Sequence, residues 1–334
     1  MAAVEEATTV TYEQLADIER EFDDVETEII RQQVQLTKSL YAKRHRTVAQ
    51  IPNFWPLVLE QAPPDIDQHI QPSDSALLLS SLTALTVTHF ELEATNADRG
   101  DPRSVAIRWE FAQNAYFEDA VLEKRFWHRR TRDGWAGLVS EPVAIRWKKG
   151  KDLTGGLLDM VKRVWDEEQL KGGKAAAGKT KKRAGLTAEQ RALKRKIEDT
   201  GLGGLSFFAW FGYVGRRVSA AENELALAKE EERRKLRREG KPAETTEDAD
   251  ENEDAGEDEE DEEDESLEIF PDGDELAIAI TQDLWPGAIK YFTQAQEQDA
   301  LSDDDFESDD EGEDGAGATT GGDDEERPPK KRKA

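Results

Sequence analysis

The stretch Thr11–Val48 has the sequence TYEQLADIEREFDDVETEIIRQQVQLTKSLYAKRHRTV. Its apolar residues, together with one glutamine, recur from position 15 to 36 at alternating spacings of three and four, the a/d pattern of a heptad repeat. The residues in this seam are Leu15, Ile18, Phe22, Val25, Ile29, Gln32 and Leu36, and the seam continues through Leu40. The stretch contains no Pro or Gly, and Pro52 follows it closely. We therefore predict one uninterrupted helix over residues 11–50.

The length of this helix argues for a partner. At 1.5 Å per residue it would run roughly 55 Å, which is longer than one small domain covers. Its apolar stripe is narrow and is buried most simply by a second copy of the same helix, so we expect a homodimer. The alternative is an amphipathic helix that lies on its own domain. Gln32 is the kind of polar seam residue that fixes register at some cost in stability.

Charge is distributed in blocks along the chain, whose net charge is -29. Glu244–Glu265 contains 16 acidic residues and Asp303–Glu326 contains 13, with no Lys or Arg in either block. Lys171–Lys196 instead contains ten basic residues and one acidic residue. Blocks of like charge stay disordered and often serve as interaction tails. Such acidic segments repel nucleic acids and attract very basic proteins.

Several function classes have no support in the sequence. The chain has no Cys, which excludes disulfides, cysteine nucleophiles and cysteine-ligated zinc. Its four His residues show no metal-ligand spacing, and no nucleophilic triad stands out, so we expect no metal, no cofactor and no enzyme activity. Residues 173–180 match the P-loop pattern, but we predict no strand before them and therefore no nucleotide site. We expect neither a signal peptide nor a membrane span.

After the long helix the apolar period changes from helical to two. We predict strands at Leu85–Glu93, Val105–Phe111, Val121–Arg129 and Val143–Trp147, joined by turns, which favours an antiparallel sheet with one buried face. The aromatic run Ser206–Phe211 predicts a buried helix. The fold class is therefore α+β.

The composition also predicts how the chain is divided. We expect a disordered N-terminus at 1–10, the long helix at 11–50, one domain at 51–292 and a disordered acidic tail at 293–334. Inside the domain we expect a mobile basic linker at 155–203 and a charged helix with an acidic insert at 216–268.

Three motifs carry a family resemblance. They are IPNFWP at 51–56, RWKKGKDLT at 146–154 and SFFAWF at 206–211, and they lie between the heptad helix and the acidic tail. In this order they resemble the nucleosome assembly protein family of histone chaperones, nearest to its SET branch. The chain departs from the family by having Ala115 in place of a Pro, and by the charged insert at 219–265.

The resemblance implies a fold and a function. It implies a homodimer joined by the long helix, with antiparallel-sheet "earmuff" domains backed by helices, whose acidic surface binds core histones and promotes nucleosome assembly and disassembly. Carried onto this chain, the histone-binding acids are Glu91, Glu93, Glu110, Glu118, Asp119, Glu123, Asp274, Glu275 and Asp283. The alternative is a non-catalytic regulatory subunit or inhibitor of a nuclear enzyme, a histone acetyltransferase or a protein phosphatase. No sequence-specific nucleic acid binding is expected.

The last residues point to the nucleus. A compact basic cluster, Lys330, Lys331, Arg332 and Lys333, suits a nuclear import signal, and we expect a nuclear protein that can shuttle to the cytoplasm. Ser302 and Ser308 each precede acidic residues, a context that acidophilic kinases prefer, and phosphate there would add negative charge.

Overall fold

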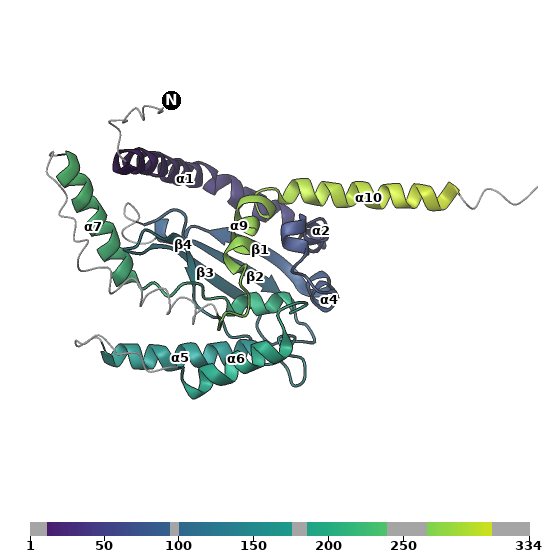
Figure 1. The fold of residues 1–334 in the computed structure, drawn as a ribbon. Helices are drawn as coiled ribbons and strands as arrows, with labels where there is room; N and C mark the ends of the chain where they lie inside the picture. The colour runs from purple at the N-terminus through teal and green to yellow at the C-terminus, as the bar shows by residue number, and fades with distance from the viewer. Residues whose placement is uncertain (1–11, 94–99, 176–185, 239–265, 309–334) are drawn as a thin grey trace, which may run out of the picture.

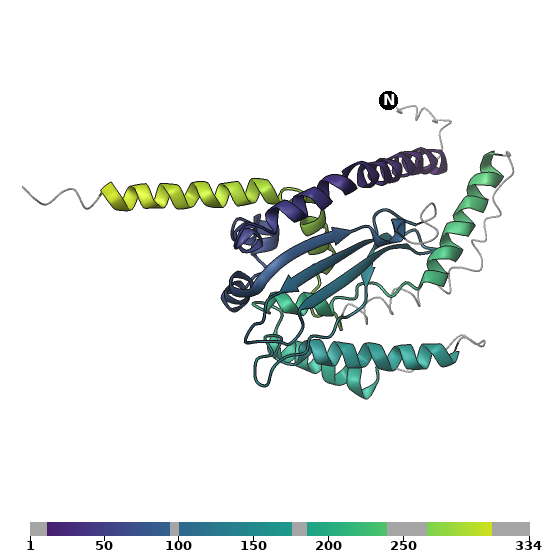
Figure 2. The same cartoon turned by 180° about the vertical axis from the view of Figure 1, so that it is seen from behind.

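A long helix, a four-stranded antiparallel sheet and surrounding helices make up the α+β fold of the computed structural model, which describes residues 12–93, 100–175, 186–238 and 266–308 (Figure 1). The helix α1 lies along one side of the sheet, the pair α5 and α6 lies on the opposite side, and α10 projects away from one end, as the reverse view also shows (Figure 2).

The bounds of the elements are as follows. The α-helices are α1 (Tyr12–Val48), α2 (Phe54–Glu60), α3 (Pro64–Asp67), α4 (Pro72–Ser81), α5 (Leu157–Ala175), α6 (Ala188–Thr200), α7 (Ala220–Arg238), α9 (Gly273–Ala279) and α10 (Ala288–Ser308). The strands are β1 (Leu82–Thr88), β2 (Val105–Phe111), β3 (Val121–Arg130) and β4 (Ala136–Ser140). Short helical turns are η1 (Phe90–Leu92), η2 (Phe207–Gly212) and η3 (Ile280–Leu284).

The predicted long helix is confirmed as α1. It runs without a break because nothing in it disrupts the helical hydrogen bonds, and it ends shortly before Pro52. Asn53 then adopts a left-handed conformation with φ of 56°, which Asn tolerates better than most residues, and starts α2.

The sheet is a meander in the order β1-β2-β3-β4, with every neighbouring pair antiparallel. Three of the predicted strands are confirmed, although β1 ends at Thr88 and the chain then turns through η1. In β2 the residues of one parity are buried, and Val87 pairs with Ile107 and Trp109 with Leu122 across the sheet. The period of two therefore marks one buried face, as expected.

The predicted fourth strand at Val143–Trp147 is wrong. The fourth strand is β4, which follows the turn at Gly134 and pairs with the end of β3. Pro142 precedes the predicted segment and has no N–H to donate to a sheet. The Val143 backbone N–H instead donates to the Phe211 carbonyl at 2.8 Å, and Phe117 and Trp147 form an isolated bridge. The alternation therefore reflects packing against η2 rather than membership of the sheet.

The core lies between the sheet and η2. All six residues of η2 are buried, as the sequence predicted for this aromatic run, although the helix is of the 3-10 type. Trp109 packs edge-on against Phe207 at 5.2 Å between ring centroids, and Phe126 stacks on Trp210 at 5.4 Å. Edge-to-face and offset pairs of this kind stabilise a core beyond the area they bury.

A buried carboxylate fixes η2 to α4. Asp74 is fully buried, and it accepts hydrogen bonds from the Ser206 hydroxyl at 2.6 Å and the Phe207 N–H at 2.7 Å. It also accepts one from the Gln71 N–H at 3.1 Å, which caps α4. One side chain thus satisfies the first turns of two helices.

The prediction of a mobile linker at 155–203 is wrong for most of that range. The helices α5 and α6 occupy it, and α6 begins with a capping box formed by Thr187 and Gln190. Val161, Val164 and Leu193 are buried, so the two helices pack through an apolar face. Residues 176–185 of the predicted linker lie outside the described residues.

The predictions for the remaining segments are partly confirmed, partly wrong, and partly outside the described residues. The charged helix of the insert is confirmed as α7, whereas its acidic run at 239–265 lies outside the described residues. The acidic tail does not begin at 293, because α10 continues to Ser308 and Ala295 is buried. Residues 1–10, residues 309–334 and the cluster Lys330–Lys333 lie outside the described residues.

We predict that Asp74→Ala lowers the free energy of unfolding by about 3 kcal/mol, because it leaves three buried or half-buried donors without an acceptor. Urea unfolding followed by tryptophan fluorescence measures this. The control is Asp199→Ala, an exposed position near the end of α6, which should change stability by about 0.5 kcal/mol or less. Equal midpoints for the two variants would show that Asp74 does not anchor η2.

Candidate functional site

The apolar stripe of α1 points away from its own domain. Its seven apolar residues, from Leu15 to Leu40, expose between 52% and 76% of their surface. Gln32, the polar residue of the seam, is also exposed and donates a hydrogen bond to the Glu28 carboxylate within the same helix at 3.0 Å. A stripe this apolar and this exposed is typical of an interface.

The opposite face of α1 contacts the body of the molecule mainly through polar side chains. Arg31 donates to the Gly100 carbonyl at 2.9 Å, and Lys38 pairs with Glu93 at 3.0 Å. Nearer the N-terminus Arg20 pairs with Glu230 on α7 at 2.6 Å, and Asp23 pairs with Arg130 on β3 at 3.1 Å. These pairs align the helix without using its stripe.

Aromatic packing holds the C-terminal part of α1. Tyr41 packs on Trp285 with 4.0 Å between ring centroids, and the Arg44 guanidinium lies 4.5 Å from the Trp285 ring and donates to its carbonyl. Val48 is buried in the core. The expected alternative, a helix lying on its own domain, is thus true of this face, but it leaves the stripe uncovered by the described residues.

The nine predicted histone-binding acids lie in three regions. Glu91 and Glu93 lie at η1 beside α1, and Asp274, Glu275 and Asp283 lie on α9 and η3. The four others, Glu110, Glu118, Asp119 and Glu123, lie on β2, on β3 and in the connection between these strands. The nine acids are therefore spread over several elements of the fold.

Arginines neutralise the acids of the sheet region. Arg108 pairs with Glu110 at 3.0 Å and lies 3.9 Å from Glu123, which pairs with Arg125 at 2.9 Å. Asp119 pairs with Arg146 at 2.7 Å. The polar face of the sheet is therefore mixed in charge rather than acidic. Ion pairs of exposed side chains contribute little to stability, so an incoming cation can replace the arginine at little cost.

The remaining acids differ in how available they are. Glu91 accepts a hydrogen bond from the Asp101 N–H at 2.9 Å, and Asp283 accepts the Tyr291 hydroxyl at 2.9 Å. Glu118 and Glu275 are exposed and have no ion-pair partner among the described residues. These two are the predicted acids best placed to meet a basic partner directly.

A buried lysine lies on the core side of β3. Lys124 is fully buried, and its ammonium donates to the carbonyls of Glu141 at 3.0 Å, Phe211 at 3.2 Å and Tyr213 at 2.8 Å. Its three donors are thus satisfied. Burial nevertheless lowers the pKa of Lys124 to about 7, although the nearby carboxylates of Glu268 and Glu141 act against this shift.

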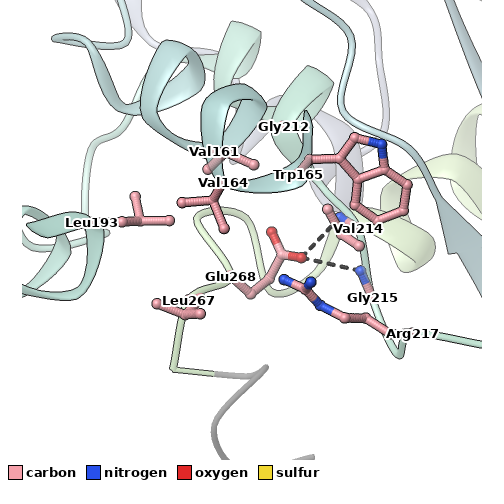
Figure 3. A pocket seen from close by; sticks show the side chains of 10 residues that line it. All are labelled: Val161, Val164, Trp165, Leu193, Gly212, Val214, Gly215, Arg217, Leu267 and Glu268. Atoms are coloured by element: carbon pink, nitrogen blue, oxygen red, sulfur yellow. Dashed lines mark hydrogen bonds between the residues drawn. The ribbon is translucent and has the colours of Figure 1, made fainter. Parts of the chain in front are cut away.

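A half-buried glutamate fixes the chain where it returns from the acidic insert. The Glu268 carboxylate accepts the backbone N–H groups of Val214 at 2.9 Å and Gly215 at 3.1 Å, inside a small pocket walled by α5, α6 and η2 (Figure 3). Burial raises the pKa of Glu268 above its ordinary value. The pocket holds only about 20 Å³, so it leaves no room for a ligand larger than water.

Sequence reasoning missed both Lys124 and Glu268. Lys124 shares its parity with the core residues Leu122 and Phe126, so alternation along β3 was a usable signal. Glu268 lies between Leu267 and Ile269 directly after an acidic run, and nothing in its local pattern distinguishes it.

Other candidate sites receive no support from the described part of the chain. No group of three or more His, Asp or Glu residues there could hold a metal ion. None of the described helices is long and apolar enough to span a membrane. The first residues of the P-loop match, Gly173–Ala175, belong to α5, so a helix rather than a strand precedes it.

Comparison with known proteins agrees with this architecture. The sequence profile of the family described as nucleosome assembly protein matches residues 3–295. A nucleosome assembly protein of Schizosaccharomyces pombe is 36% identical over 153 residues, which cover 42% of this chain and 59% of that protein. Protein SET of Drosophila melanogaster is 33% identical over 37% of this chain and 43% of its own length. The chain thus spans about half the length of these two relatives.

Longer matches are more distant. The vacuolar protein sorting-associated protein 75 of Saccharomyces cerevisiae is 23% identical over 88% of this chain and 81% of its own length. A crystal structure of Vps75 superposes with a TM-score of 0.50 at 20% identity and covers 84% of this chain and 96% of that one. At this identity the superposition establishes the shared fold alone.

We predict that Ile29→Glu converts the protein from a dimer to a monomer, because it puts a charge at the middle of the stripe, where a paired helix would bury it. Light scattering measures the mass, and circular dichroism should show an intact fold, since Ile29 faces away from the domain. The matched control is Gln35→Glu, which adds the same charge to α1 at an exposed position outside the seam. A dimer mass for Ile29→Glu would contradict the assignment.

We also predict that the stability contributed by Lys124 rises with pH. In the unfolded chain the pKa of Lys124 has its ordinary value of 10.5, whereas in the folded protein it is about 7. Between about pH 7 and 10.5 the unfolded state therefore binds one more proton than the folded state, and the free energy of unfolding increases with pH. The difference in free energy of unfolding between the wild type and Lys124→Met should increase by about 1 kcal/mol per pH unit between about pH 8 and 10. Urea unfolding measures this difference. A constant difference would mean that Lys124 stays charged in the fold.

Proposed function

Since the chain belongs to the nucleosome assembly protein family, we propose that it is a histone chaperone that binds core histones as a homodimer and promotes nucleosome assembly and disassembly. The observation that carries this proposal is the family match over 3–295, which includes α1, the sheet and η2. The outward stripe of α1 supports the dimer, because seven exposed apolar side chains on one helix need a partner.

The proposed mechanism is neutralisation of histone charge. Histones are very basic, and the acids proposed to bind them lie at η1, along the sheet and on α9 and η3. Glu118 and Glu275 would pair with histone Lys or Arg directly, whereas Glu110, Glu123 and Asp119 would exchange an intrachain arginine for a histone one. Since exposed pairs of this kind are weak, the exchange costs little and is reversible. A chaperone needs this reversibility in order to release histones to DNA.

The acidic runs in the sequence would act at longer range. They raise the rate of encounter with a basic partner, but screening limits their reach to about 8 Å at physiological salt. We propose that the runs capture histones and that the folded surface gives specificity. In this scheme the protein has no catalytic role.

The cellular setting is proposed on the same grounds. A nucleosome assembly protein works on chromatin, so we place the chain in the nucleus, imported through Lys330–Lys333 and able to shuttle. The alternative role, regulation of a histone acetyltransferase or a protein phosphatase, stays a prediction, since no contact of the described residues favours it.

The test is the mass of the complex with core histones by light scattering, near 0.15 M and near 0.5 M salt. We expect a dimer with the same histone ratio at both salts, because contacts on a folded surface are screened less than those of a tail. Polyglutamate of matched charge is the control and should lose its histones at the higher salt. A protein that loses them in the same way would bind through its acidic runs alone, which contradicts a folded binding surface.

A further inference from the structure

A hollow of about 300 Å³ lies between α2, α3 and α4. Its wall is largely apolar, and the residues that carry the argument are Leu59, Ile70, Leu78, Leu79, Glu60 and Asp67. Leu59 and Leu78 are buried beneath it, whereas Leu79 remains 41% exposed. Specific ligand sites in proteins begin at about this volume, so the hollow has room for an apolar side chain.

The charges around the hollow have one sign. Among the described residues that line it, Glu60 and Asp67 are acidic and exposed, and none is basic. Asp65, two residues before Asp67 on α3, is also acidic and exposed. An apolar floor under an acidic rim selects a partner that is both apolar and basic.

The end of the molecule that carries the hollow also carries α10. Helix α10 packs against α2, where Gln61 donates to Gln298 at 2.8 Å, and it projects from this end (Figure 1). The α10 sequence from Asp299 to Ser308 contains five more acidic residues. The hollow therefore lies at the end of the molecule from which α10 projects.

We propose that this hollow binds an aliphatic or aromatic side chain from a basic segment of a histone, while Glu60 and Asp67 pair with the Lys or Arg residues that flank this anchor. The proposal deepens the histone-chaperone function and rests on it. It supplies an element that the acidic residues lack, because burial of an apolar side chain is not screened by salt. The hollow thus gives binding that persists when the ion pairs are weakened.

The decisive variant is Leu79→Glu, because it has opposite effects on electrostatic binding and on apolar binding. It adds negative charge next to the hollow, which would tighten purely electrostatic binding to a histone. It also removes apolar surface, which weakens binding of an apolar histone side chain in the hollow. We expect its affinity for histones at about 0.5 M salt to fall by about tenfold or more. The probe is labelled recombinant core histones, each histone pair titrated separately and followed by fluorescence anisotropy.

The matched control is Leu170→Glu on α5, where a leucine that is 69% exposed lies outside the hollow. It makes the same chemical change and should bind as the wild type does or slightly more tightly. A second variant tests the proposal without changing Leu79, so that the result does not depend on how Leu79→Glu folds. Glu60→Gln with Asp67→Asn removes only exposed charges and should weaken binding at about 0.15 M salt more than Glu198→Gln with Asp199→Asn on α6.

Each outcome decides the matter. Loss of affinity in Leu79→Glu and in the double rim variant, but in neither control, supports the proposal. Equal affinity of Leu79→Glu and Leu170→Glu overturns it and leaves the histone-chaperone function standing. A Leu79→Glu variant whose only change is in its own oligomeric mass also overturns it, because the hollow would then hold a second copy of the chain. Wild-type protein that binds no histone overturns the proposed function itself.

Discussion

The division of α1 into two faces is the constraint on which the rest of the molecule depends. Most amphipathic helices bury their apolar stripe against their own domain. Here the inward face is largely polar, with Arg20, Asp23 and Arg31 in contact with α7, β3 and the turn at Gly100, while the stripe faces out. Because these polar contacts fix how the helix is rotated on the body, the domain itself determines which way the interface points.

The body in turn depends on a few buried or half-buried polar groups around an aromatic core. Asp74 fixes the start of η2 to α4, and Lys124 holds three carbonyls around the end of η2. Glu268 adds the segment that returns from the acidic insert. A long and highly charged insertion is therefore tolerated, because the chain is held by buried contacts on both sides of it. Aromatic packing fills the space, and the buried charges fix which segments meet.

Elements that are determined by the spacing and type of neighbouring residues could be predicted from the sequence. The heptad seam of α1, the alternation in β2 and the burial of Ser206–Phe211 all followed from spacing and residue type. The fourth strand failed because Val143–Trp147 alternates against η2, a partner distant in the chain, and the linker failed because its Gly, Ala and Lys content hid the buried Leu193. Of the site, the stripe was predictable, and the pairs Arg108–Glu110 and Glu123–Arg125 also have a local cause, since their members lie two residues apart on one strand. The hollow beside Leu79 arises from tertiary packing and leaves no local pattern.

The anchoring of α10 has a consequence for how a large ligand is held. Trp285, which precedes α10, packs on Tyr41 and Arg44 near the C-terminal end of α1, so the base of α10 moves with that helix. If two such helices run antiparallel in a dimer, the bases of the two α10 helices lie roughly 50 Å apart at opposite ends. In such a dimer the span between the two α10 helices would be set by α1. A ligand that contacted both would meet the second at an effective concentration fixed by the length of α1, so that weak contacts would add up.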